Sequence, residues 1–166
     1  LLLLAACCGI PPAATARPQS PGNPPNIVLL YADDLGAGDL SRDGNPHART
    51  PRLDRLAAEG LVFTHGYAPS AQCSPSRAAL LTGQSPARLH LTTFIPDKPK
   101  DVPAPVWRGL SIPPQRERLA PSLVTIAERL REAGYATAHL GKWHVGDGPS
   151  APQNQGFDTV LGSWPW

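Results

Sequence analysis

The stretch "NIVLLYADD", residues 26–34, decides the fold expected for this chain. Its apolar run from Ile27 to Tyr31 is short and unbroken, which is typical of a strand buried on both faces in a parallel sheet. The run ends at two adjacent acids, Asp33 and Asp34, followed by a glycine-containing loop. Because ligands of open α/β sheets bind beyond the carboxyl ends of the strands, these acids lie where a site is expected.

The segment after this loop has residues typical of the two ends of a helix. In "TPRLDRLAAEG", Thr50 is the expected N-cap, Pro51 the first helical residue and Gly60 the residue just past the end. The following residues 61–68, "LVFTHGYA", are expected to form a short strand. The residues from Pro86 to Pro121 contain many prolines and little periodicity, so we expect a long surface excursion there.

The clearest helical pattern of the chain lies in "PSLVTIAERLREAG", residues 121–134. Ser122 is its expected N-cap, an apolar stripe follows, and Gly134 is its expected stop. Residues 135–144, "YATAHLGKWH", then return as a strand that ends at a polar cluster. Strands alternating with helices predict an α/β fold with a largely parallel sheet.

Composition narrows the class of protein. The formal charge of +2, without a Lys/Arg-rich run, gives no reason to expect nucleic acid as a partner. With 41% hydrophobic and 17% charged residues, the chain is globular rather than a disordered tail. Of its three cysteines, Cys7 and Cys8 lie near the start, so Cys73 is left alone and no disulfide framework is expected.

The first residues, "LLLLAACCGIPPAATA", resemble the later part of a secretory signal. The apolar run is too short to cross a bilayer as a helix. Two processing sites are alternatives: a lipobox that makes Cys7 a lipid-anchored residue, or cleavage after "ATA" at residues 14–16. We therefore expect a truncated signal at 1–16, a Pro-rich linker at 17–25, an incomplete domain at 26–166, and export to the periplasm, cell surface or medium.

Cys73 stands at the start of "CSPSRAALLTG", residues 73–83. Pro75 suits the first turn of a helix, so Cys73 is expected near a helix N-terminus, where free N–H groups favour an anion. Arg77 adds a permanent positive charge and a bidentate donor for an oxyanion. Spacing alone leaves three alternatives: an anion site, an inert buried cysteine, or a thiolate nucleophile.

Two further pairs of polar residues are candidates for the same chemistry. Asp33 and Asp34 repel one another if they aim at one point, and a hard cation such as Ca²⁺ or Mg²⁺ relieves that repulsion; the alternative is a solvated turn. Lys142 and His144, in "GKWH", lie two residues apart at a strand end and so share a face. They suit binding of an anionic ester and proton transfer, while solvation at the surface is the alternative.

Together these residues carry a resemblance. The stretch "CSPSRAALLTG" resembles the sulfatase signature Cys-x-Pro-Ser-Arg followed by Leu-Thr-Gly, and it matches at each fixed position. The resemblance extends, in order, through "NIVLLYADDLGAGDL", "TPRLDRLAAEG", "SLVTIAERLREAGYATAHLGKWH" and "GFDTVLG". It covers residues 26–162.

The resemblance implies an alkaline-phosphatase-like α/β fold, with a mixed, mainly parallel sheet flanked by helices and truncated at its C-terminal side. It also implies that a separate maturation enzyme oxidises Cys73 to formylglycine, whose aldehyde hydrates to a gem-diol. One hydroxyl of the diol attacks sulfur and expels the alcohol; the second then loses its proton, and sulfate leaves. The expected reaction is hydrolysis of aryl or carbohydrate sulfate esters.

Residue by residue, the resemblance implies that Asp33, Asp34 and the modified Cys73 bind a divalent cation, Ca²⁺ or alternatively Mg²⁺. Arg77 would stabilise the diol, Lys142 would contact the sulfate, and His144 would accept a proton during sulfate release. The further metal ligands, a second His and Lys, and the smaller C-terminal domain of the family are absent from these 166 residues. We therefore expect the chain to be inactive by itself.

Three other functions stay open from the sequence. A phosphonate or phosphate monoester hydrolase of the same superfamily would share most of these residues. A surface binding protein with the same fold would have lost catalysis, which the retained Cys73, Arg77, Lys142 and His144 argue against. A thiol-dependent hydrolase would use Cys73 unmodified and would be inactivated by thiol-blocking reagents.

Overall fold

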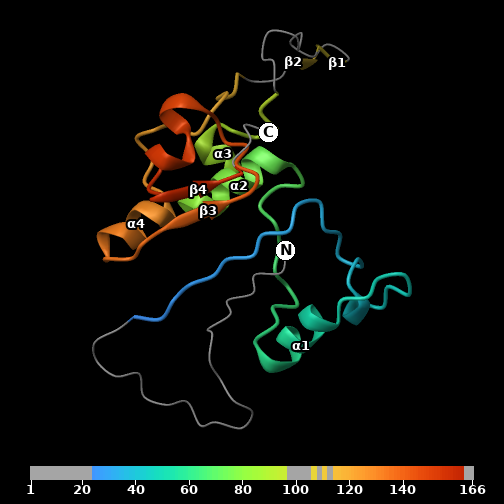
Figure 1. The fold of residues 1–166 in the computed structure, drawn as a ribbon. Helices are drawn as coiled ribbons and strands as arrows, with labels where there is room; N and C mark the ends of the chain where they lie inside the picture. The colour runs from blue at the N-terminus through green and yellow to red at the C-terminus, as the bar shows by residue number, and fades with distance from the viewer. Residues whose placement is uncertain (1–23, 97–105, 108–109, 112–113, 163–166) are drawn as a thin grey trace. The chain divides into compact units, whose positions relative to one another are not determined.

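The computed structural model describes residues 24–96, 106–107, 110–111 and 114–162. These residues belong to two compact units, one ending at Tyr67 and one beginning at Ala68, and each is described by itself. Figure 1 shows their elements along the chain. The predicted signal, including Cys7, and most of the linker lie outside the described residues. Among the described residues, no helix is long and apolar enough to cross a membrane.

The first unit contains a short 3₁₀ helix, η1 (Ser41–Asp43), and helix α1 (Pro51–Glu59). Helix α1 begins and ends as predicted, between Thr50 and Gly60. The Thr50 side chain does not cap the helix backbone; its Oγ1 donates to Asp54 Oδ1 at 3.1 Å instead. Ser41 Oγ donates to the other oxygen of the same carboxylate at 2.6 Å, so these hydroxyls tie η1 to α1.

Two predictions for this unit are wrong. Residues 27–30 are not a buried strand: their side chains are 43–56% exposed, and the extended backbone has a single bridge residue at Leu29. Residues 61–67 form no strand: Thr64 and His65 make a turn, and Leu61 is 72% and Tyr67 80% exposed. A strand is covered only where other strands and helices pack on it, and the described part of this unit contains no β-strand element.

The described part of the second unit contains three α-helices: α2 (Cys73–Thr82), α3 (Pro86–Leu89) and α4 (Ile126–Glu132). Helix α2 packs against both α3 and α4. It ends at Gly83, whose φ of 68° is the left-handed conformation that glycine adopts most readily.

Helix α4 starts later than predicted. Its N-cap is Thr125 rather than Ser122, because Thr125 forms a capping box with Glu128. The Thr125 hydroxyl accepts from the Glu128 N–H at 3.2 Å, and the Glu128 carboxylate accepts from the Thr125 N–H at 2.7 Å. This reciprocal pair satisfies two helix-terminal N–H groups at once, which a cap by Ser122 alone would not do. The predicted stop at Gly134 follows the last turn.

Strand β3 (Ala138–Leu140) pairs in parallel with β4 (Thr159–Leu161), with Ala138 opposite Thr159. The connection between them contains two 3₁₀ helices, η3 (Gly148–Ser150) and η4 (Pro152–Asn154). Strands β1 (Val106–Trp107) and β2 (Leu110–Ser111) form a separate antiparallel pair. The helices and the parallel pair confirm the predicted α/β class.

The core of the second unit gathers buried side chains from several elements: Ala78, Leu89, Leu91, Leu119, Trp143 and Val145. Leu89, Leu91 and Leu119 lie in the predicted surface excursion of residues 86–121, yet each is at most 3% exposed. That prediction is therefore wrong for the two ends of the segment. Single buried leucines separated by prolines and polar residues give no helical or strand period, so the pattern could not reveal them.

Candidate active site

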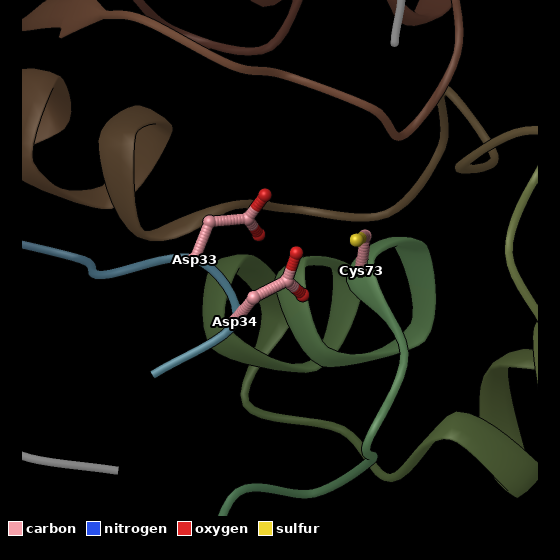
Figure 2. A group of neighbouring side chains, drawn as sticks. All are labelled: Asp33, Asp34 and Cys73. Atoms are coloured by element: carbon pink, nitrogen blue, oxygen red, sulfur yellow. The ribbon is translucent and has the colours of Figure 1, made fainter. Parts of the chain in front are cut away.

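Cys73 is the first residue of α2, preceded by the N-cap residue Gln72. Figure 2 shows its sulfur at the N-terminal end of this helix, as the sequence predicted. The thiol is free and half-buried. The residues that follow it are buried, with Ser74 0%, Ser76 5% and Arg77 9% exposed. The turn therefore holds Cys73 at its outer edge and the rest of the motif inside.

Lys142 and Arg77 come together beside Cys73. The Lys142 ammonium Nζ lies 3.2 Å from Cys73 Sγ, although 69 residues separate the two. The Arg77 guanidinium Nη1 donates to the backbone carbonyl of Lys142 at 2.5 Å. Arg77, which is buried one turn into the helix, thus fixes the backbone from which Lys142 reaches the sulfur.

The electrostatics of this site favour an anion. A helix N-terminus carries partial positive charge and free N–H groups, and Lys142 and Arg77 add two full positive charges nearby. An oxyanion such as a sulfate group is stabilised by this arrangement. Cys73, Arg77 and Lys142, which were singled out in the sequence, thus lie close together, and their roles stay predictions.

His144 reaches its position by a different route from the one predicted. Strand β3 ends at Leu140, so Lys142 and His144 follow it in a turn and do not share a strand face. Gly141 has a φ of 98° and His144 a φ of 55°, which is a strained backbone conformation for a residue with a side chain. Such strain persists only where the surroundings hold it, and it concentrates at functional sites.

The His144 ring is 8% exposed, and its two nitrogens differ. Nε2 lies 2.8 Å from the backbone carbonyl oxygen of Ile95. Nδ1 is buried and has no hydrogen-bond partner among the described residues. A buried ring nitrogen without a partner is costly, and it is the kind of atom that a substrate or a reacting group satisfies.

Asp33 and Asp34 lie in the first unit, after the extended segment. Figure 2 shows both carboxylates pointing the same way, and one oxygen of each lies within 4.8 Å of an oxygen of the other. Both residues are exposed, and Asp34 has a left-handed φ of 56°. A left-handed residue at the end of an extended segment turns the chain, so neighbouring acids need not point to opposite faces. Two adjacent carboxylates are a donor set that fits Ca²⁺ or Mg²⁺.

Two residues beside Cys73 were missed in the sequence. The side-chain carbonyl of Gln72 accepts from the Phe94 N–H at 2.8 Å, and Ser74 Oγ accepts from the Ile95 N–H at 2.9 Å. Both contacts connect the start of α2 to a segment 21 or 22 residues further along the chain. That segment has no periodic pattern, so no signal in the sequence could have paired them.

A cluster of three rings includes Trp143, the residue between Lys142 and His144. His139 contacts Trp143 with ring centroids 5.0 Å apart and Phe157 at 5.3 Å, while Trp143 and Phe157 meet edge to face at 5.8 Å. Burial lowers the pKa of His139, and the nearby charge of Arg77 lowers it further, against the opposing effect of its hydrogen bond to Gly141. These surroundings therefore favour the neutral form of the ring.

The chain is similar in sequence to known proteins. The family model described as Sulfatase matches residues 25–166. The chain is 45% identical to human Arylsulfatase A over 164 residues, which cover 97% of this chain and 28% of that protein. It is 43% identical to mouse N-acetylgalactosamine-6-sulfatase over 165 residues, 98% of this chain and 29% of that protein. It therefore spans less than a third of the length of these relatives.

Similarity extends to solved structures. A crystal structure of Ps i-CgsB aligns with a TM-score of 0.65 and 33% identity, over 81% of this chain and 27% of that one. A second crystal structure of Ps i-CgsB, in complex with k-i-k-neocarrahexaose, aligns with a TM-score of 0.60. The described elements thus follow the course of a known three-dimensional fold.

Proposed function

Because the chain belongs to the sulfatase family, we propose that the whole protein hydrolyses sulfate esters at a site centred on Cys73. The observation that carries this proposal is the position of Lys142 Nζ, 3.2 Å from Cys73 Sγ at the N-terminus of α2. A sulfate group brought to this sulfur would meet a positive charge and free helix N–H groups as it arrives.

Cys73 is proposed to carry the reaction as formylglycine, made by a separate maturation enzyme. A hydrated formylglycine supplies a nucleophilic hydroxyl that a thiol does not have. Lys142 would bind and orient the sulfate, because its ammonium already lies within hydrogen-bond distance of the side chain at position 73. Arg77 would hold Lys142 in place through its carbonyl and keep the local potential positive.

Asp33, Asp34 and the modified Cys73 are proposed to hold a divalent cation, Ca²⁺ or alternatively Mg²⁺. The support from the structure is the pair of exposed carboxylates with oxygens within 4.8 Å of one another. A bound cation would polarise the sulfate oxygens and neutralise negative charge. The acids, for their part, would supply hard oxygen ligands from two consecutive residues on a chain turned by Asp34.

The substrate class is proposed from the relatives. The mouse relative is named N-acetylgalactosamine-6-sulfatase, and one crystal structure of Ps i-CgsB is a complex with k-i-k-neocarrahexaose. We propose a carbohydrate sulfate or an aryl sulfate as the substrate of the whole protein. Export, with lipidation at Cys7 or cleavage of a signal at residues 14–16, belongs to the same proposal, because the first 16 residues resemble the later part of a secretory signal.

Mass spectrometry of the Cys73 peptide from the whole protein, made in a host that matures a control sulfatase, tests the proposed modification. Formylglycine appears as a cysteine in which the elements of H₂S have been exchanged for oxygen. In parallel, the rate with an aryl sulfate is compared with the rates for the matching phosphate monoester and phosphonate ester. We expect formylglycine and a preference for sulfate.

The Cys73→Ser variant should retain the first displacement and lose turnover, because a serine that has taken up sulfate has no second hydroxyl to expel it. Full turnover by this variant would contradict the mechanism. A preference for the phosphate or phosphonate ester would instead identify the related superfamily activity. An unmodified thiol with activity sensitive to thiol-blocking reagents would identify a cysteine hydrolase.

A further inference from the structure

Three successive backbone N–H groups of the segment Thr93–Ile95 each donate a hydrogen bond to a side-chain oxygen. Thr93 N donates to Gln115 Oε1 at 3.1 Å, Phe94 N to Gln72 Oε1 at 2.8 Å, and Ile95 N to Ser74 Oγ at 2.9 Å. An extended segment without a partner strand would leave these donors to solvent. Here two of the three acceptors stand directly before and after Cys73.

Ile95 is restrained from four directions. Its N–H is held by Ser74, which is fully buried, and its side chain packs against the core of the second unit. The following residue, Pro96, restricts the backbone of Ile95 to extended conformations. The fourth contact is the His144 ring, whose Nε2 lies 2.8 Å from the Ile95 carbonyl oxygen. This carbonyl therefore has a fixed place and direction.

A fixed carbonyl decides where the His144 ring carries its proton. A carbonyl oxygen only accepts hydrogen bonds, so the ring nitrogen facing it must be the one that bears hydrogen. In a neutral imidazole the other nitrogen is then the lone-pair acceptor. That other nitrogen is Nδ1, which is buried and has no partner among the described residues.

We propose that Ser74, acting through the backbone of Ile95, is a positioning residue that fixes His144 as the Nε2–H tautomer and leaves Nδ1 as its basic atom. Ser74 touches no reacting group in this role. It fixes the position of the Ile95 carbonyl, and that carbonyl determines which nitrogen of the His144 ring carries the proton. The left-handed backbone of His144 supports the same conclusion, because strain of this kind is retained where a ring must be aimed in one direction.

The catalytic consequence rests on the proposed function. When a hydroxyl at position 73 gives up its proton, the Nδ1 lone pair of His144 is the one available to take it, so the imidazole becomes an imidazolium and the oxygen an anion. A ring in the other tautomer would present N–H to that hydroxyl and could not accept the proton. Outer-sphere partners of this kind typically change activity 10–100-fold when they are removed.

The test uses the whole protein with ¹⁵N-labelled histidine and measures the two ring nitrogens of His144 by NMR, at a pH where the imidazole is neutral. His144 is assigned by its loss in His144→Asn. We expect Nε2 to carry the proton in the wild type and a mixture of tautomers in Ser74→Ala. The matched control is Ser85→Ala, which removes a serine hydroxyl that also accepts from a backbone N–H, here that of Arg88, away from Ile95.

Kinetics supply the second readout. Per mole of formylglycine, counted by mass spectrometry, Ser74→Ala should lower kcat by roughly tenfold with KM little changed, and Ser85→Ala should leave kcat unaltered. A wild-type ring with its proton on Nδ1 overturns the proposal without any variant. A Ser74→Ala protein with the wild-type tautomer and kcat also overturns it.

The two proposals fail separately. If the whole protein shows no sulfatase activity, the proposed function fails, while the tautomer measurement still decides the role of Ser74. If sulfatase activity is present and the spectrum shows Nδ1–H, the positioning role fails and the proposed function stands.

Discussion

The acid pair and the cysteine site differ in how the chain holds them. Asp33 and Asp34 sit on an exposed stretch, turned by one left-handed residue and preceded by apolar side chains that are about half exposed. Cys73 sits on a helix whose next residues are buried, and Lys142 donates to its sulfur. Arg77 donates to the Lys142 carbonyl, and the side chains on either side of Cys73 accept from the N–H groups of Phe94 and Ile95. The acid pair is therefore characterised by its charge, and the cysteine site by the side chains packed around it.

This difference teaches that the two regions should respond to different perturbations. Substituting the acids changes chemistry and leaves the fold almost as it was, because they bury nothing. Substituting residues packed around the cysteine site alters the fold first, and the altered fold then changes the chemistry. The predictions below use this contrast, from the largest expected effect to the smallest.

Asp34→Asn removes one charge and one hard ligand from the acid pair. Because a bound cation supplies several kcal/mol of transition-state stabilisation, we expect sulfatase activity of the whole protein to fall by roughly a hundredfold or more. Thermal stability in the absence of added cation should change little. Calcium titration calorimetry and the aryl sulfate assay measure the effect.

The control is Asp43→Asn, which removes a carboxylate of similar exposure that pairs with Arg42 in η1. It should retain wild-type calcium affinity. An Asp34→Asn protein with unaltered calcium binding would break the comparison, because the acid pair would then be an ordinary solvated turn.

Gly156→Ala tests the packed region. Gly156 has a φ of 91°, and an added Cβ would lie 2.4 Å from the Glu128 backbone nitrogen in the α4 capping box. We expect a loss of several kcal/mol in the free energy of unfolding, since the backbone strain alone costs about 1–3 kcal/mol and the overlap with backbone adds to it. Denaturant unfolding of the whole protein measures it.

Gly134→Ala is the matched control, because Gly134 has nearly the same φ, 88°, with no atom within 4 Å of an added Cβ. Its free energy of unfolding should fall only by the cost of the backbone strain. Equal destabilisation by the two variants would mean that the contact between Gly156 and Glu128 does not constrain the unit.

His139 should make the packed region sensitive to acid. Burial lowers its pKa below the usual histidine value of 6.5, so the unfolded chain binds a proton more readily than the folded one. Stability should therefore fall as the pH drops from about 6.5 through the lower folded pKa, and it should be unaffected by this group above that window. His139→Phe keeps an aromatic ring beside Trp143 and Phe157 and removes the titration.

Melting temperatures of the wild type and His139→Phe at about pH 7.5 and about pH 5.5 measure this effect. The wild type should lose more stability than the variant over this range. An equal loss in both proteins would show that other groups cause the acid sensitivity.

Thr137→Val should give the smallest effect. The Thr137 N–H and hydroxyl donate to Asp158 Oδ2 at 2.9 and 3.0 Å, and they lower the pKa of this carboxyl. The valine keeps the backbone donor and removes the hydroxyl, so the pKa of Asp158 should rise part of the way toward 3.8. A carbon-detected NMR titration of the carboxyl measures it.

The stability that this contact contributes is present above the pKa of the unfolded carboxyl and is lost as the pH falls through the lower folded pKa. Thr82→Val is the control, because it removes a hydroxyl that donates to the Ala78 carbonyl at 2.7 Å and accepts from the Gln84 N–H at 3.3 Å. It should leave the Asp158 titration as it is in the wild type.

The features that could be predicted from the sequence depend on residues close to one another along the chain. Pro51 and Gly60 mark the bounds of α1, and Pro75 marks the first turn of α2, because proline and glycine act on the backbone within a few residues. The Cys73 and Lys142 contact spans 69 residues, and only the resemblance to a family joined the two in the sequence. Residue types alone left solvation of Lys142 as the default.

What could not be predicted depends on distant neighbours. The apolar run at residues 27–31 reads as a buried strand, yet burial is a property of what packs on it, and the described first unit supplies no strand to do so. Thr125 displaced Ser122 as a cap because Glu128 completes a reciprocal pair. Ser74 and Ile95 meet through one hydrogen bond between segments without a shared pattern.

The burial of Ser74, Ser76 and Arg77 has a consequence in time. If Cys73 is modified as proposed, the maturation enzyme must read the residues that follow it, and in the folded helix these side chains are at most 9% exposed. Recognition and folding would then compete for the same residues during biosynthesis. A chain that folds this helix before modification would keep Cys73 as an unmodified thiol. The fraction of active molecules would then be set by the relative rates of folding and modification, and not by an equilibrium.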